Sequence, residues 1–225
     1  MDYRIYHKVL NKLKTNQRTW LCFSASVLFL TLCPAIGALG LIIIMVVVWQ
    51  HNYHAIMASY LCKTLGLLAG LLIISSALAE YPQSAWLGLA NFLPYFALFI
   101  AFRCLITELS QLRQLAWLLI LPSVPIVILG LGQLFFAWDT PLWVETILGW
   151  ELVPSGVPAG RMSAVFIYAN FLAIYLAIAF TLTVGLWWTT WQQSSKLKIP
   201  ILWLLTLILV LDVSCLLYTS PSPRD

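Results

Sequence analysis

The sequence predicts an all-α fold, a polytopic transmembrane helical bundle. Of its 225 residues, 62% are hydrophobic and only 9% are charged, whereas a soluble domain carries about 25% charged residues. The hydrophobic residues also occur in long blocks, as a helix that crosses about 30 Å of hydrocarbon requires. The sequence lacks the strand-length alternation of apolar and polar residues that is typical of a membrane β-barrel.

Seven apolar blocks predict about seven spans. They are Trp20–Cys33, Ala35–Trp49, Tyr60–Ala79, Ser84–Phe102, Leu112–Ala137, Met162–Thr189 and Ile199–Val213. The first two are short, each about 21 Å long as a helix. They form either two helices that turn near Pro34–Gly40 or one long helix that is kinked at Pro34.

The basic residues predict the orientation of the bundle, because cytoplasmic loops collect Lys and Arg. Residues 1–19 form a basic leader with five such residues and are expected in the cytoplasm. The turn around Glu80 has none and is expected outside, so an odd number of spans must precede it. This favours the two-helix interpretation and puts ten of the twelve basic residues inside, all but Arg161 and Arg224. We therefore expect a multi-pass protein of the cell inner (plasma) membrane, embedded in its lipid bilayer, with a cytoplasmic N-terminus.

The charge and cysteine patterns exclude several other classes. The net charge of +4 comes from residues at the ends of apolar blocks, which argues against a nucleic-acid partner. The five cysteines are spread singly, so they predict neither a metal site nor a disulfide framework. His51 and His54 are expected in a loop before Tyr60, without an evident third ligand. No metal and no cofactor is predicted.

The last eleven residues, CLLYTSPSPRD, differ from the rest of the chain. The hydrophobic segment is expected to stop at Ser214, and the codons of the segment after it can be written as the end of a transposon adapter used in sequencing libraries. We therefore expect three parts: a leader (1–19), an incomplete transmembrane domain (20–214) and an adapter-derived tail (215–225). A natural tail without regular structure is the alternative.

Arg161 is the strongest candidate for chemistry. It follows the Pro- and Gly-rich segment 154–160 and is expected to open the sixth span on the outer side. A guanidinium binds phosphate or diphosphate through two parallel hydrogen bonds, and a helix N-terminus adds affinity for anions. Ser163 is expected to supply a further donor, and Asn170 is expected to face the bundle interior, because a buried amide needs partners.

Roles in structure or lipid contact, without substrate binding, are the alternatives for Arg161 and Asn170. Arg161 would serve equally as an interfacial arginine that extends to lipid headgroups, or it would pair with Glu145 or Glu151. Asn170 would serve as an ordinary interhelical hydrogen-bonding residue.

The segment from Gly160 to Ala173, GRMSAVFIYANFLA, resembles the Arg…Asn-x-Leu-Ala signature of the O-antigen ligase and O-antigen polymerase family. The segments Glu80-Tyr81-Pro82, Leu87–Pro94 and Gly130–Phe135 are also similar to its cyanobacterial, bicarbonate-transporter-like branch. The resemblance covers roughly residues 20–214. It implies the N-terminal part of a GT-C-like fold, a multi-helix class of lipid-linked-sugar glycosyltransferase.

The resemblance implies an activity on the outer face of the membrane, where a glycan moves from undecaprenyl diphosphate to an acceptor. It assigns the donor diphosphate to Arg161, with Ser163 and Asn170 as further substrate-binding candidates, and makes a polyprenyl-diphosphate-linked glycan the partner. The family also has a second arginine and a catalytic histidine, both expected beyond Ser214. No catalytic residue is therefore predicted in this chain, and the fragment is predicted to be inactive.

A solute transporter, bicarbonate-like, is the alternative function. It would require polar groups near mid-span and broken helices around a midplane site.

Overall fold

The computed structural model describes residues 17–192 and 198–219, and the described residues form helices joined by loops, without a strand. The predicted helical fold class is confirmed. The leader residues 1–16 and the tail residues 220–225 lie outside the described residues. In these described ranges, six helical segments are long and apolar enough to cross a membrane, which supports a multi-pass membrane protein.

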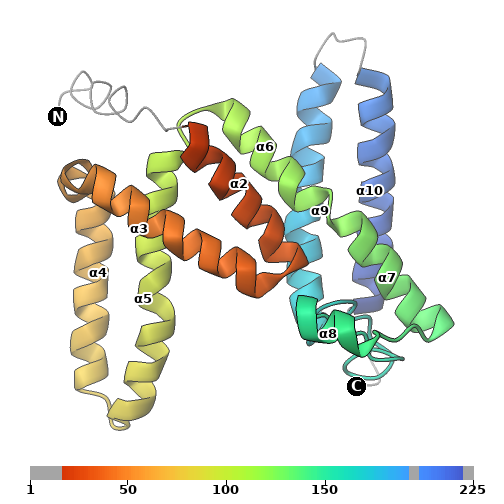
Figure 1. The fold of residues 1–225 in the computed structure, drawn as a ribbon, viewed down its shortest axis with the longest axis horizontal. Helices are drawn as coiled ribbons and strands as arrows, with labels where there is room; N and C mark the ends of the chain where they lie inside the picture. Colours follow the sequence, from red (N-terminus) through yellow and green to blue (C-terminus); the bar gives the residue numbers. More distant parts are fainter. Residues whose placement is uncertain (1–16, 193–197, 220–225) are drawn as a thin grey trace. The chain divides into compact units, whose positions relative to one another are not determined.

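The chain divides into two compact units, residues 1–26 with 38–111 and residues 27–37 with 112–225. In chain order, the helices are α2 (Gln17–Leu32), α3 (Pro34–Ala58), α4 (Tyr60–Ala77), α5 (Pro82–Leu105), α6 (Leu109–Ile120), α7 (Ser123–Phe136), α8 (Leu142–Leu148), α9 (Ala169–Gln192) and α10 (Lys198–Thr219). Figure 1 shows them along the chain.

The first two predicted blocks form two helices that turn at Cys33, as the charge pattern favours. The turn is tight because Gly37 leaves room for the main chain of Leu30, and Gly40 leaves room for the side chain of Ser26. α2 has only 16 residues, about 24 Å at 1.5 Å per residue, so it is too short to count among the six candidate spans. The predicted number of about seven is roughly consistent with six such segments and this shorter helix.

The expectation of a loop around His51 and His54 is wrong. α3 continues to Ala58, with one non-helical residue at Asn52, and the break comes at Ser59. The Ser59 side chain accepts a hydrogen bond from the Cys62 main-chain nitrogen at 3.1 Å and so caps α4.

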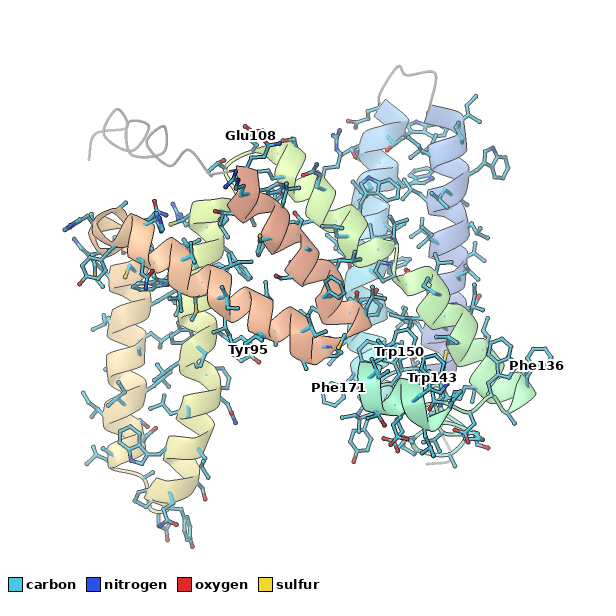
Figure 2. All side chains as sticks on the ribbon, in the orientation of Figure 1. Tyr95, Glu108, Phe136, Trp143, Trp150 and Phe171 are labelled. Atoms are coloured by element: carbon cyan, nitrogen blue, oxygen red, sulfur yellow. The ribbon has the colours of Figure 1, made fainter. Side chains whose placement is uncertain are left out.

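In the first unit, α4 and α5 lie side by side as an antiparallel pair (Figure 1). They are joined by a turn that ends at Tyr81, where the sequence predicts one. The Trp49 indole donates to the Ala97 carbonyl at 3.0 Å, and the rings of Phe23 and Phe102 are 4.7 Å apart. Along α4 no residue is buried, as suits a helix whose apolar side chains face lipid. Figure 2 shows these side chains projecting outward.

In the second unit, α9 and α10 pair along their length, and α7 packs against α10. The predicted span Leu112–Ala137 is divided, because α6 ends at Ile120 and α7 begins at Ser123. The predicted span Met162–Thr189 also begins late, since α9 starts only at Ala169. α10 runs to Thr219, five residues past the end expected at Ser214; the adapter origin of residues 215–225 stays a prediction.

Candidate functional site

The loop between α8 and α9, residues 149–168, folds into the second unit instead of lying on its surface. Its backbone reverses at residues with positive φ, among them Ser155 (75°), Gly156 (78°) and Gly160 (84°). The apolar run after Arg161 is buried without being helical, and Met162 and Ala164 are completely inaccessible. Hydropathy therefore identified the burial of this run correctly, but the run packs as loop.

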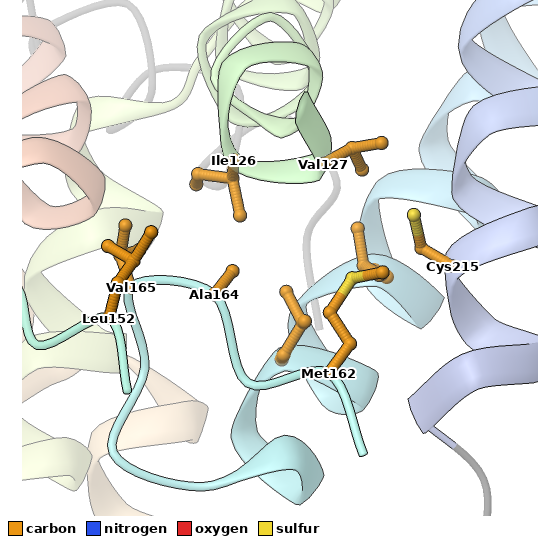
Figure 3. Packing of buried hydrophobic residues seen from close by; sticks show 9 residues of the cluster. Ile126, Val127, Leu152, Met162, Ala164, Val165 and Cys215 are labelled. Atoms are coloured by element: carbon orange, nitrogen blue, oxygen red, sulfur yellow. The ribbon is translucent and has the colours of Figure 1, made fainter. Parts of the chain in front are cut away.

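The buried side of the loop packs against α7. Figure 3 shows Ile126 and Val127 of α7 next to the loop that carries Leu152, Met162 and Ala164. Gly130 on α7 is needed here, because a Cβ at that position would collide with the Met162 side chain. At the beginning of the loop, next to α8, the indole of Trp150 donates to the Leu32 carbonyl at 2.8 Å. Trp150 lies near α8 in Figure 2.

Gln133, a fully buried amide on α7, fixes the loop. Its Nε2 donates to the Val153 carbonyl at 2.8 Å and to the Ser163 hydroxyl at 3.1 Å. Its Oε1 accepts from the main-chain nitrogens of Ser163 at 3.2 Å and Ala164 at 2.9 Å. The Gln133 side chain thus joins two segments of the loop, the one at Val153 and the one at Ser163 and Ala164. The role of Gln133 was not predicted from the sequence, although a lone amide in the apolar run of Gly130–Phe135 is a signal of a buried hydrogen-bonding role.

Arg161 lies in the loop, half-buried, where it joins the ends of α9 and α10. Its Nε and Nη2 donate to the Thr219 carbonyl at 3.0 and 2.5 Å, and Nη2 also donates to Asn170 Oδ1 at 2.8 Å. The expectation that Arg161 sits at a helix N-terminus is wrong, because seven residues separate it from the start of α9 at Ala169. It instead caps the C-terminal end of α10, where unpaired carbonyls attract a cation.

The contacts described above use only some of the hydrogen-bond donors of the Arg161 guanidinium. Arginine has five N–H donors, and the hydrogen bonds above use the one on Nε and both on Nη2. Among the residues that the structure describes, the partners of Arg161 are neutral oxygens, and neither Glu145 nor Glu151 pairs with it. Among the described residues the two N–H groups of Nη1 have no acceptor, so they are available to a further one.

The other two predicted substrate-binding residues, Asn170 and Ser163, differ in exposure to solvent. Asn170 is exposed on the first turn of α9, so the expectation that it faces the bundle interior is wrong. It meets Arg161 because the intervening residues are mostly non-helical; in a continuous helix, a spacing of nine would place the two on opposite sides. Ser163 is fully buried and bonded to Gln133, so it supports the loop rather than pointing outward with Arg161.

A small open pocket of about 130 Å³ lies in the outer part of the loop region. Glu151, Val153, Val157, Ile167 and Tyr168 line it. Its lining includes a carboxylate and does not include Arg161, so it does not extend the cationic site. Within the described ranges, no group of three or more His, Cys, Asp or Glu side chains could hold a metal ion.

Comparisons with protein-family models, with curated proteins and with solved structures found no match to this chain.

Proposed function

We propose that this chain is the N-terminal part of a membrane glycosyltransferase of the O-antigen ligase or polymerase type, and that Arg161 binds the diphosphate of a polyprenyl-linked glycan donor. The observation that carries the proposal is the state of the guanidinium. It is partly exposed, its Nη2 donates to the neutral Oδ1 of Asn170 at 2.8 Å, and among the described residues its Nη1 donates to no hydrogen-bond acceptor.

This arrangement suits an anionic oxygen. The hydrogen bond that Nη2 donates to Asn170, a residue before the expected tail, restrains the guanidinium, so less side-chain entropy remains to be lost on binding. A diphosphate gathers negative charge as it departs from the sugar, and a positioned cation would stabilise that charge. The hydrogen bonds of Gln133 to Val153 and Ala164, which flank Arg161 in the loop, also favour anion binding, because they hold the Arg161 main chain at a defined position.

The proposed reaction needs groups that this chain does not contribute. We expect the acceptor to be activated by a histidine, and the diphosphate to receive a second arginine, from sequence that follows residue 214 in the parent protein. The chain is therefore expected to bind the donor and not to transfer the glycan. We also propose that it lies in the plasma membrane with its N-terminus in the cytoplasm and the loop of Arg161 outside, as the distribution of basic residues favours.

The test is a binding measurement on the purified chain in lipid nanodiscs. Undecaprenyl diphosphate is titrated into the wild type, Arg161→Lys and Arg113→Lys, the last being a control because Arg113 is an exposed arginine of α6. Lysine keeps the charge but loses the planar fork, so Arg161→Lys should weaken binding about tenfold or more. Equal affinities for wild type and Arg161→Lys would contradict the proposal.

A solute transporter is the second candidate, and one observation favours it. The candidate span Leu109–Phe136 is broken near its middle, between Ile120 and Ser123. Broken helices of this kind line midplane binding sites in many transporters. The outcome that would favour transport is uptake of bicarbonate into proteoliposomes that contain the chain, with no affinity for undecaprenyl diphosphate.

A further inference from the structure

A second polar cluster lies inside the helices of the second unit, and the proposed binding of diphosphate does not use it. Asp212, on α10, is 0% exposed, and so is Ser123 at the start of α7. Both carboxyl oxygens of Asp212 and the hydroxyl oxygen of Ser123 lack a hydrogen-bond partner among the described residues. The Ser123 hydroxyl lies beside the Asp212 carboxyl, close enough to interact but outside hydrogen-bond geometry. Three unpartnered oxygens are thus collected from two helices.

These oxygens lie where the α6–α7 span is interrupted. Pro122 occupies the break and has no main-chain N–H, so the carbonyl four residues before it loses its helical donor. At the same break, the Tyr175 hydroxyl of α9 donates to the Leu119 carbonyl at 2.8 Å. Unwound helix segments supply oxygen ligands to buried Na⁺ and proton sites in many transporters. Here Tyr175 occupies the Leu119 carbonyl, so among the described residues the oxygens without a partner at the break are those of Asp212 and Ser123.

The surroundings of Asp212 bring no compensating positive charge. The ionisable groups close enough to interact electrostatically with it are the Tyr175 hydroxyl of α9 and the Cys215 thiol of α10, and the Ser123 hydroxyl of α7 interacts with it as well. Its carboxyl has no lysine, arginine or histidine as a hydrogen-bond partner in the part of the chain that the structure describes. A carboxylate that is buried among apolar helices without a partner is costly, so the group needs a bound cation.

We propose that Asp212 and Ser123 form a binding site for a small monovalent cation, a proton or Na⁺, at the break between α6 and α7. Both cations require oxygen ligands and both neutralise the carboxylate. The site goes beyond the proposed glycan transfer and does not depend on Arg161.

The test uses the hydrophobic carbodiimide N,N′-dicyclohexylcarbodiimide, which modifies carboxyl groups in their protonated form inside membrane proteins. The purified full chain is labelled over a range of pH, with NaCl or with choline chloride, and labelled residues are located by mass spectrometry. Asp139 serves as the internal control, because it is an aspartate exposed outside the helices. Asp212→Asn gives the background, and Ser123→Ala removes one of the three oxygens.

The expected result is labelling of Asp212 and not of Asp139. If Na⁺ is the ligand, NaCl at about ten times its Kd slows the labelling about tenfold at constant pH, and Ser123→Ala weakens that protection about tenfold. If the ligand is a proton, alkaline pH alone suppresses labelling. The proposal is overturned if Asp212 stays unlabelled at every pH, or if its labelling rate responds neither to pH nor to Na⁺. Binding of undecaprenyl diphosphate, measured in parallel, separates this outcome from failure of the proposed function.

Discussion

Replacement of Gln133 by leucine should release the loop that carries Arg161. Leucine has a similar volume but makes none of the hydrogen bonds of Gln133 to Val153, Ser163 and Ala164. At about 1 kcal/mol for each net hydrogen bond, the loss has an upper value of about 4 kcal/mol. The loop can relax and admit water, so we expect about half of this, about 2 kcal/mol, to appear as easier local opening.

Hydrogen–deuterium exchange measures that opening directly. A loss of about 2 kcal/mol corresponds to about thirtyfold faster exchange at the main-chain amides of Ser163 and Ala164. The core of α9, around Leu176, should keep its protection, because the hydrogen bonds of Gln133 go to Val153, Ser163 and Ala164 in the loop. Gln50→Leu is the matched control, since Gln50 is exposed on α3. Exchange at the two amides that stays within about twofold of the wild type would refute the role of Gln133 as the anchor.

Two glycines provide further predictions, each with a glycine control. Gly130→Ala should lower stability by about 1–3 kcal/mol, because its Cβ would collide with a methionine side chain of the loop. Gly185→Ala is the control, since a Cβ there meets nothing within 4 Å. Thermal unfolding in detergent compares the two variants, and equal unfolding midpoints would contradict the close packing at Gly130. Gly156→Ala should displace the main chain of Arg161, whose carbonyl oxygen its Cβ would overlap, and should weaken binding of undecaprenyl diphosphate. Gly149→Ala, also at positive φ but in open space, should cost only about 1–2 kcal/mol of backbone strain and leave binding unchanged; equal binding by the two variants would argue against the positioning of Arg161 by the loop.

The helical membrane fold could be predicted because composition and block length report directly on burial in a bilayer. The turn after α2 could be predicted because the cytoplasmic position expected of the basic leader, with Glu80 expected outside, calls for an odd number of crossings between them. The division of the span at Pro122 was not predicted, since apolar residues adjoin the break on both sides and the apolar run continues across it. For the same reason, Met162 and Ala164 were expected in a helix although they pack as loop. Hydropathy measures where a segment lies and not which backbone it adopts.

The candidate site could be predicted only in part. Arg161 and Asn170 were identified by residue type and by resemblance, and the structure brings them together at 2.8 Å. Their contact depends on the non-helical path of residues 161–168, which no periodicity indicates. The roles of Gln133 and Asp212 depend on contacts between helices that are distant in sequence. A single polar residue in an apolar block signals a partner, but it does not say which helix supplies that partner.

The most direct test of the central claim is a photocrosslinking measurement with a polyprenyl diphosphate that carries a photoreactive group near the diphosphate. If Arg161 binds the diphosphate, the adduct maps to the loop, residues 150–168, unlabelled undecaprenyl diphosphate competes with it, and Arg161→Lys reduces its yield. An adduct confined to other residues, or one whose yield is the same in Arg161→Lys, would contradict the account.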